Sequence, residues 1–251
     1  GDPLPMGTVG SDFDLYASWM EKTGVSRAHV QEIQDALTAQ AFITTDLDDN
    51  QITAFHPGAM NHAAVNKISD ARGVSLGIIS PDGRDGMIEH AQQFADANIP
   101  FVFDPGQGLP MFDGADLKNF IELATWVSVN DYEGELMQER TGFSAQQIAD
   151  QLDAFIVTRG GEGSTIFTRG GEIAIPCADA KELVDPTGCG DAYRAGLLYG
   201  LMNDLDWNVT GRIASLCGAI KIESAGTQNH SFTRDSFAER YGNTYSQTLN
   251  W

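Results

Sequence analysis

Residues 185–191 are Asp185-Pro186-Thr187-Gly188-Cys189-Gly190-Asp191, a glycine-rich turn that runs directly into a predicted helix. Gly188 and Gly190 leave room for an anion to approach bare backbone N–H groups, and the helix start adds unpaired donors and the positive end of its dipole. Asp191 lies in the first helical turn, where the dipole stabilises a charged carboxylate that can accept a proton from a hydroxyl group. An anion site and a base within one turn suit phosphoryl transfer to an alcohol.

The same stretch also has a purely structural interpretation. The glycines then supply tight turn dihedrals, and Asp191 only complements the start of the helix. In both interpretations the helix continues, because Ala192, Ala195 and Gly196 give it a face of small residues for close packing. Taken alone, the motif does not separate the two interpretations.

Short apolar runs alternate with amphipathic segments through the middle of the chain. The runs at residues 74–79, 101–103, 126–129 and 155–157 predict buried strands. Strand–helix alternation predicts an α/β fold with a central, mostly parallel sheet, helices on both faces, and ligands at the carboxyl ends of the strands. Asp104, Asn130 and Thr158 fall at those ends.

Residues 41–45 and 51–56 interrupt this pattern and predict a hairpin, joined by a polar turn at residues 46–50. The hairpin is either a small lid or an ordinary edge hairpin. Asp46, Asp48 and Asn50 begin like a calcium loop, but Gln51 and Pro57 stand where that loop requires Gly and Glu. We therefore exclude a calcium loop.

Composition limits the class of protein and its partners. At 251 residues we expect a single α/β domain, residues 1–251, with a small β lid at about residues 41–57. The net charge of −20 and the pI near 4.3 argue against nucleic-acid and membrane partners. The three cysteines show no C-x-x-C spacing, which favours a reducing cytoplasm over a disulfide or zinc framework. No apolar run approaches the ~18 residues of a membrane span.

Two further motifs carry polar groups at the ends of predicted strands. Asn130 and Glu133 lie one helical turn apart, and their oxygen atoms suit Mg²⁺ and its waters when phosphates supply the remaining ligands. By itself this pair more often marks a helix start with a surface carboxylate. Thr158, Gly160 and Gly163 can hold a nucleotide through a hydroxyl and an open backbone, but alone they would only indicate a hairpin. Walker and dinucleotide-binding glycine motifs are absent from the sequence.

These motifs together resemble one family. Residues 185–196 resemble the C-terminal signature of the ribokinase-like (PfkB) sugar and nucleoside kinases, residues 130–133 resemble its N-x-x-E motif, and residues 157–163 resemble its T-x-G-x-x-G nucleotide segment. Residues 7–13 resemble the early G-x-V-G-x-D stretch, although Asp14 stands where the family often has Gly. The resemblance covers essentially the whole chain, with matching order and spacing. Residues 44–59 and 103–108 look most like bacterial adenosine (nucleoside) kinases.

The resemblance implies a ribokinase-like fold and ATP-dependent phosphorylation of the 5′-hydroxyl of a purine nucleoside, most similar to adenosine kinase. It implies that Asp191 is the base and that the backbone amides of Gly188, Cys189 and Gly190 hold the transferring phosphoryl group. The implied ligand contacts are Asn130, Thr158, Gly160, Gly163 and Gly226 for ATP, Glu133 for Mg²⁺ through water, Asp185 and Thr187 for K⁺, and Asp104, Gln107 and Phe55 for the acceptor.

Other expectations also follow from the resemblance. Family members begin with roughly sixty further residues that precede the first residue of this chain. We expect a monomer or homodimer in the cytoplasm. Two rivals remain: a sugar kinase of the fructokinase or ribokinase type, and a regulator that binds nucleotide or sugar without turnover.

Overall fold

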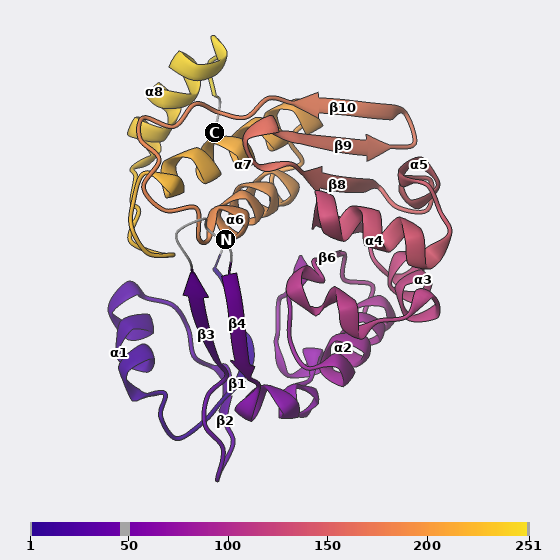
Figure 1. The fold of residues 1–251 in the computed structure, drawn as a ribbon, viewed down its shortest axis with the longest axis vertical. Coiled ribbons are helices and arrows are strands. Elements are labelled where there is room, and N and C mark those ends of the chain that lie inside the picture. Colours follow the sequence, from indigo (N-terminus) through magenta and orange to yellow (C-terminus); the bar gives the residue numbers. More distant parts are fainter. Residues whose placement is uncertain (1, 46–50, 250–251) are drawn as a thin grey trace. The chain divides into compact units, whose positions relative to one another are not determined.

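The computed structural model of the chain describes residues 2–45 and 51–249. They divide into two units, Gly1–Ala124 and Thr125–Trp251, each of which combines parallel strands with helices (Figure 1). The turn predicted at residues 46–50 lies outside the described residues.

The first unit contains two parallel strand pairs and one hairpin. β1 (Met6–Val9) pairs with β2 (His29–Glu32), and α1 (Asp14–Thr23) connects them. β3 (Gln40–Thr45) and β4 (Gln51–His56) pair antiparallel, as predicted. β5 (Gly77–Ile79), shorter than predicted, pairs parallel with β6 (Phe101–Phe103) across α2 (Arg84–Asp96). The remaining elements are η1 (Gly58–Val65), η2 (Ile68–Asp70), η3 (Gly106–Met111) and α3 (Gly114–Leu123).

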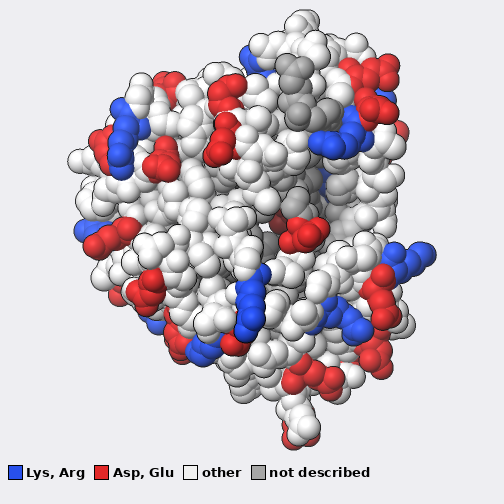
Figure 2. All heavy atoms as spheres, turned by 180° about the vertical axis from the view of Figure 1, so that it is seen from behind, with Lys and Arg blue, Asp and Glu red and all other residues white. Residues whose placement is uncertain are grey.

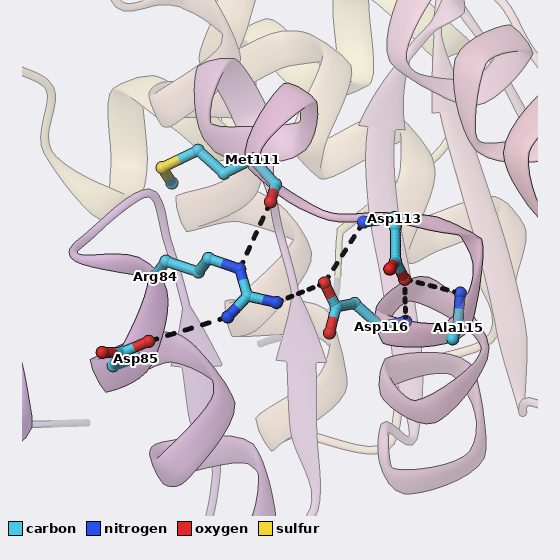
Figure 3. Close-up of polar contacts among 6 residues, drawn as sticks. All are labelled: Arg84, Asp85, Met111, Asp113, Ala115 and Asp116. Carbon is cyan, nitrogen blue, oxygen red and sulfur yellow. Dashed lines mark hydrogen bonds and ion pairs between the residues drawn. The ribbon is translucent and has the colours of Figure 1, made fainter.

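Arg84 joins the starts of α2 and α3 (Figure 3). Its guanidinium lies 2.6 Å from Asp116 Oδ2 and donates to the carbonyl of Met111 at 3.3 Å. The Asp113 side chain accepts from the N–H groups of Ala115 and Asp116, and Asp116 accepts from the Asp113 N–H in return. This capping box satisfies N–H groups that a helix start leaves unpaired, so α3 begins at a defined residue beside α2.

The second unit holds a sheet whose strands β8, β9 and β10 lie side by side (Figure 1). β7 (Trp126–Asn130) runs parallel to β8 (Ala154–Thr158), while β9 (Ser164–Thr168) and β10 (Gly171–Ile175) extend the sheet antiparallel. The helices are α4 (Asp131–Thr141), α5 (Ala145–Ala149), α6 (Cys189–Met202), α7 (Trp207–Ile222) and α8 (Arg234–Tyr245), with η4 (Gly160–Glu162) after β8.

Helices cover both faces of the strands of the second unit. On one face, Gly134 of α4 is close enough to Val129 and Val157 that a Cβ there would lie 3.5 to 3.6 Å from their methyl groups. On the other face, Ala154 and Ile156 pack in one buried cluster with Leu197 of α6 and Ala214 of α7. Successive strand residues point to opposite faces, so β8 is buried on both sides, as its continuous apolar sequence predicts.

The close approach of α6 and α7 depends on glycine. A Cβ at Gly196 would lie 2.6 Å from the Cα of Ala214, which is closer than real Cβ atoms come. Gly196 and the buried Ala192 of the predicted small-residue face therefore lie against α7, whereas Ala195, the third predicted residue of that face, is exposed.

The surface carries many acidic side chains. On the face drawn in Figure 2, basic side chains are scattered among acidic ones. Within residues 2–45 and 51–249, no helix is both long and apolar enough to cross a membrane.

Candidate active site

The anion turn, residues 185–191, ends where α6 begins. Gly188 is the residue before the helix and adopts φ 85° and ψ 5°, a left-handed conformation that favours glycine. A Cβ there would also lie 3.2 Å from the Cβ of Thr227. Cys189, Gly190 and Asp191 are the first three residues of α6, and Asp191 is exposed. The predicted base and the predicted phosphate amides therefore lie within one helical turn.

The turn uses one of these amides internally. The Cys189 N–H donates to the carbonyl of Pro186 at 3.1 Å. A phosphoryl group that binds this amide must share it with Pro186 or replace it. Gly190 lies one residue further into the helix, where the N–H groups of a first turn lack intrahelical partners.

Arg194 brings a positive charge to the same helical turn, and the sequence analysis missed it. Its Nη1 donates to the carbonyl of Gly190 at 3.2 Å. A residue four positions after Gly190 on a helix lies on the same face, so this spacing was the available signal.

Asp185 holds the anion turn against the segment that follows α7. Its Oδ1 accepts from the Thr187 N–H at 2.9 Å, and its Oδ2 accepts from the Gly226 N–H at 2.8 Å. These hydrogen bonds from Thr187 and Gly226 lower the pKa of Asp185 to about 2, so the carboxylate is ionised at neutral pH. Gly226, predicted as an ATP contact, is thereby brought beside the turn.

Asn130 and Thr158 lie next to each other at the carboxyl ends of two parallel strands, where the β7–β8 register pairs them directly. Asn130 Oδ1 accepts from the Glu133 N–H at 2.7 Å, and Glu133 Oε2 accepts from the Asn130 N–H at 2.8 Å. The pair is thus a capping box that starts α4, and Glu133 is only 7% exposed. The helix-start interpretation is therefore confirmed, except that the Glu133 carboxylate is buried and not on the surface, and the Mg²⁺ role stays a prediction.

A buried contact couples α6 to these strand ends. The hydroxyl groups of Tyr193 and Ser164 share a hydrogen bond of 2.8 Å, and Ser164 pairs with Thr158 in the β8–β9 register. Burial raises the pKa of Tyr193 to about 12, so its hydroxyl stays neutral. Asp191, two residues before Tyr193, is therefore anchored in the same part of the unit as Thr158 and Asn130.

The loop after β8 gives its two predicted glycines different surroundings. Gly163 has φ 87°, and a Cβ there would lie 2.2 Å from the carbonyl oxygen of Ile175, so this glycine is required by close backbone packing. Its carbonyl also accepts from the Arg159 N–H at 2.8 Å, which closes the loop. Gly160 has φ 52°, and a Cβ there would meet no described atom within 4 Å, so there is open space beside its Cα, while its carbonyl accepts from the Gly163 N–H at 3.1 Å.

The donor set fits Mg²⁺ only with help from a phosphate. Within residues 2–45 and 51–249, no group of three or more His, Cys, Asp and Glu side chains is placed to hold a metal. Mg²⁺ keeps several waters and is commonly bound by one or two carboxylates plus substrate phosphates. Glu133 and Asn130 offer oxygens of this type at the start of α4. The Glu133 carboxylate accepts a hydrogen bond in the capping box, and its oxygens have further lone pairs for a second donor.

The Cys189 thiol is not an activated nucleophile. Burial raises its pKa, and the nearby positive charge of Lys221 opposes this rise only in part. A thiol with a raised pKa is protonated at neutral pH, so the backbone of Cys189, rather than its sulfur, is the group of interest.

The three predicted acceptor contacts belong to the first unit. Asp104 follows β6, is 4% exposed and donates its N–H to the carbonyl of Ile79 at 2.9 Å. Gln107 is exposed on η3, and Phe55 is 53% exposed on β4.

Asp82 is a second carboxyl group at the strand ends of the first unit, and the sequence analysis missed it. It follows β5 on a loop that touches the loop after β6, since a Cβ at Gly106 would lie 2.6 Å from Pro81. Burial raises the pKa of Asp82. Perturbed carboxyl groups of this kind gather at binding sites, but an isolated Pro-Asp-Gly in the sequence indicates an ordinary turn.

Comparisons with known proteins find nucleoside kinases among the proteins similar to this chain. A nucleoside kinase of Methanocaldococcus jannaschii is 31% identical over 237 residues, which cover 94% of this chain and 78% of that protein. The structure of Burkholderia thailandensis nucleoside kinase in complex with inosine is 48% identical with a TM-score of 0.96, and the match covers 99% of this chain and 82% of that one. The same enzyme in complex with ADP-inosine gives 48% identity and a TM-score of 0.95, over 99% of this chain and 78% of that one.

The fold and family predicted from the motifs are confirmed by these matches. A family model described as pfkB family carbohydrate kinase matches residues 4–234. The chain therefore belongs to the pfkB family of carbohydrate kinases and is a phosphotransferase with a hydroxyl acceptor.

Proposed function

We propose that this protein transfers the γ-phosphoryl group of ATP to the 5′-hydroxyl of a purine nucleoside. The observation that carries the proposal is the placement of Asp191 and the glycine amides in the first turn of α6. The acceptor class is supported by the 48% identity to a nucleoside kinase whose structures contain inosine and ADP-inosine. Adenosine and inosine are both purine nucleosides with a free 5′-hydroxyl, and the proposal includes both.

In the proposed reaction, Asp191 accepts the proton of the acceptor hydroxyl as that oxygen attacks the γ-phosphorus. The bond from the γ-phosphorus to the bridging oxygen breaks, and ADP leaves with the electron pair. Amide N–H groups of Gly188, Cys189 and Gly190, with the dipole of α6, stabilise the charge on the transferring group. Donors fixed in advance need no reorganisation during the reaction, whereas the Cys189 N–H must be shared with the Pro186 carbonyl or released from it.

ATP contacts are assigned to residues of the second unit. Thr158 offers a hydroxyl at a strand end, Gly160 has open space beside its Cα, and Gly226 lies beside the anion turn. Gly163 supports this loop by its close packing. Asn130 and Glu133 would hold Mg²⁺ through its waters, and Mg²⁺ would neutralise phosphate charge when bound.

Acceptor contacts are assigned to Asp104, Gln107 and Phe55 of the first unit. A buried carboxylate suits the hydroxyl groups of a ribose, and an exposed aromatic ring suits the face of a base.

The proposal predicts that ADP release requires a nucleoside. We would incubate the full-length protein with ATP and Mg²⁺, and measure ADP with adenosine, inosine, guanosine, ribose and fructose in turn. The expected result is release with the purine nucleosides alone, with the 5′-monophosphate as product. Release with sugars alone would identify a sugar kinase instead. ATP binding without acceptor-dependent release would identify a regulator without turnover.

Asp191→Asn tests the base directly. We expect kcat to fall by about 10²- to 10⁴-fold, because the variant keeps the shape of the carboxylate but cannot take the proton. The Kd for ATP should change by less than about threefold, since the backbone donors remain. The matched control is Asp235→Asn, which neutralises a first-turn carboxylate of α8 in the same unit. A near-normal kcat in Asp191→Asn would rule out the assigned role.

Glu133→Gln separates the two roles of the capping box. Gln at the third helical position preserves the hydrogen bond that starts α4, so the free energy of unfolding should change by less than about 1 kcal/mol. The loss of charge should raise the Mg²⁺ concentration for half-maximal activity by about tenfold, because removing a group that hydrogen-bonds to a metal ligand commonly weakens metal binding by at least this factor. Glu135→Gln, on the exposed side of α4, is the control. An unchanged Mg²⁺ requirement would leave Glu133 with a structural role only.

A further inference from the structure

Lys221 is a fully buried lysine beside the anion turn. It is the last residue but one of α7, and its relative exposure is 0%. Lysine is almost never fully buried unless its charge is matched by a partner. Among residues 2–45 and 51–249, two backbone carbonyls accept from it: Nζ donates to Asp185 O at 2.6 Å and to Ser224 O at 3.3 Å. Carbonyl oxygens around a dehydrated positive charge are also the way proteins hold a bare monovalent cation.

The two carbonyls belong to the segments that shape the anion turn. Asp185 begins the turn, and Ser224 precedes Gly226, whose N–H binds the Asp185 carboxylate at 2.8 Å. The end of α7 adds to this connection, because the N–H groups of Val184 and Asp185 donate to the carbonyl of Ile222 at 2.9 and 3.1 Å. The ammonium of Lys221 therefore lies where these segments meet.

The charge of this ammonium reaches the groups around the turn. It contributes to the lowered pKa of Asp185, and it opposes the rise in the pKa of Cys189 that burial causes. It also helps to lower the pKa of His230, after burial. The Lys221 ammonium therefore supplies a positive charge next to Asp185, one of the two residues predicted to bind potassium.

The oxygen atoms of Asp185 do not fit the expected potassium site. The carboxylate accepts from the Thr187 and Gly226 N–H groups, and the carbonyl accepts from Lys221. A cation bound at these oxygens would share them with the N–H donors, and at the carbonyl it would lie next to the Lys221 ammonium, a like charge whose repulsion low polarity strengthens.

We propose that the Lys221 ammonium is the resident cation of the anion turn and that it positions the turn for phosphoryl transfer without added potassium. This inference rests on the proposed function for its catalytic part only. Lys221 is a positioning residue: it acts through Asp185 and the backbone of the turn rather than on the reacting atoms.

The test compares the wild-type protein with Lys221→Ala and Lys221→Met. The alanine variant leaves a space that NH₄⁺ or K⁺ can enter, whereas methionine fills the same space without charge. Each full-length protein is measured in KCl, NH₄Cl and choline chloride at equal ionic strength, for melting temperature and for ADP release with inosine. Ile220→Ala, a change at a buried neighbour on α7, controls for destabilisation alone.

For the wild-type protein we expect the same melting temperature and rate, within about twofold, in all three salts. For Lys221→Ala in choline chloride we expect kcat to fall by about 10- to 100-fold, as when fixed donors lose their alignment. Adding NH₄⁺ or K⁺ should raise the kcat of this variant by about tenfold and should also raise its melting temperature. The KM for inosine should change little. Lys221→Met and Ile220→Ala should not respond to the salt.

A wild-type rate that rises severalfold with K⁺ would overturn the proposal, whether or not the variants fold. A folded Lys221→Ala that no cation restores would overturn it as well, by leaving Lys221 a purely structural role. If the wild-type protein phosphorylates no acceptor in any salt, the proposed function fails separately. The melting temperatures of the wild-type protein and Lys221→Ala in the three salts then still show whether Lys221 takes the place of a bound cation, because this measurement requires no turnover.

Discussion

The candidate site depends on how the chain holds residues 185–191 in place. A glycine-rich turn has little conformational preference of its own, and an ordered backbone costs about 1–2 kcal/mol per residue in entropy. Here the Asp185 carboxylate accepts from the Thr187 N–H within the turn and from the Gly226 N–H after α7. Lys221, near the end of α7, donates to the Asp185 carbonyl. Without these contacts the amides would not be held as a fixed candidate anion site, so the chemistry proposed for Asp191 depends on them.

The second constraint is the position of α6 relative to the strand ends. Gly196 lets α6 approach α7 closely, and the Tyr193–Ser164 hydrogen bond fixes the first turns of α6 near Thr158. Asn130 lies beside Thr158 in the strand register. The candidate base, the anion turn and the candidate nucleotide contacts, which are far apart in the sequence, are thereby held within one compact unit. Support of this kind is what catalysis by positioning requires.

Much of this arrangement was predictable because its signals are local. Strand–helix alternation predicted the α/β class, and the glycine spacing before Asp191 predicted the start of α6 at the correct turn. The hairpin strands at residues 40–45 and 51–56 followed from the same kind of pattern.

The remaining features were not predictable because they depend on contacts across long sequence separations. Lys221 lies 36 residues from the carbonyl it binds, and in sequence it looks like an ordinary basic residue near a helix end. Tyr193 and Ser164 are 29 residues apart. Local patterns therefore located the candidate reacting groups, whereas the groups that hold them in place could be found only from the fold.

The central claim is that α6 presents an anion site and a base to one reacting group. A crystal structure of the full-length protein with ADP, Mg²⁺, inosine and a planar metal fluoride would test it most directly. The account predicts that the fluoride contacts the amides of residues 188–190 and that an Asp191 carboxylate oxygen lies about 2.6–3.2 Å from the 5′-oxygen. A fluoride held elsewhere, with Asp191 out of hydrogen-bond reach of the 5′-oxygen, would contradict the account.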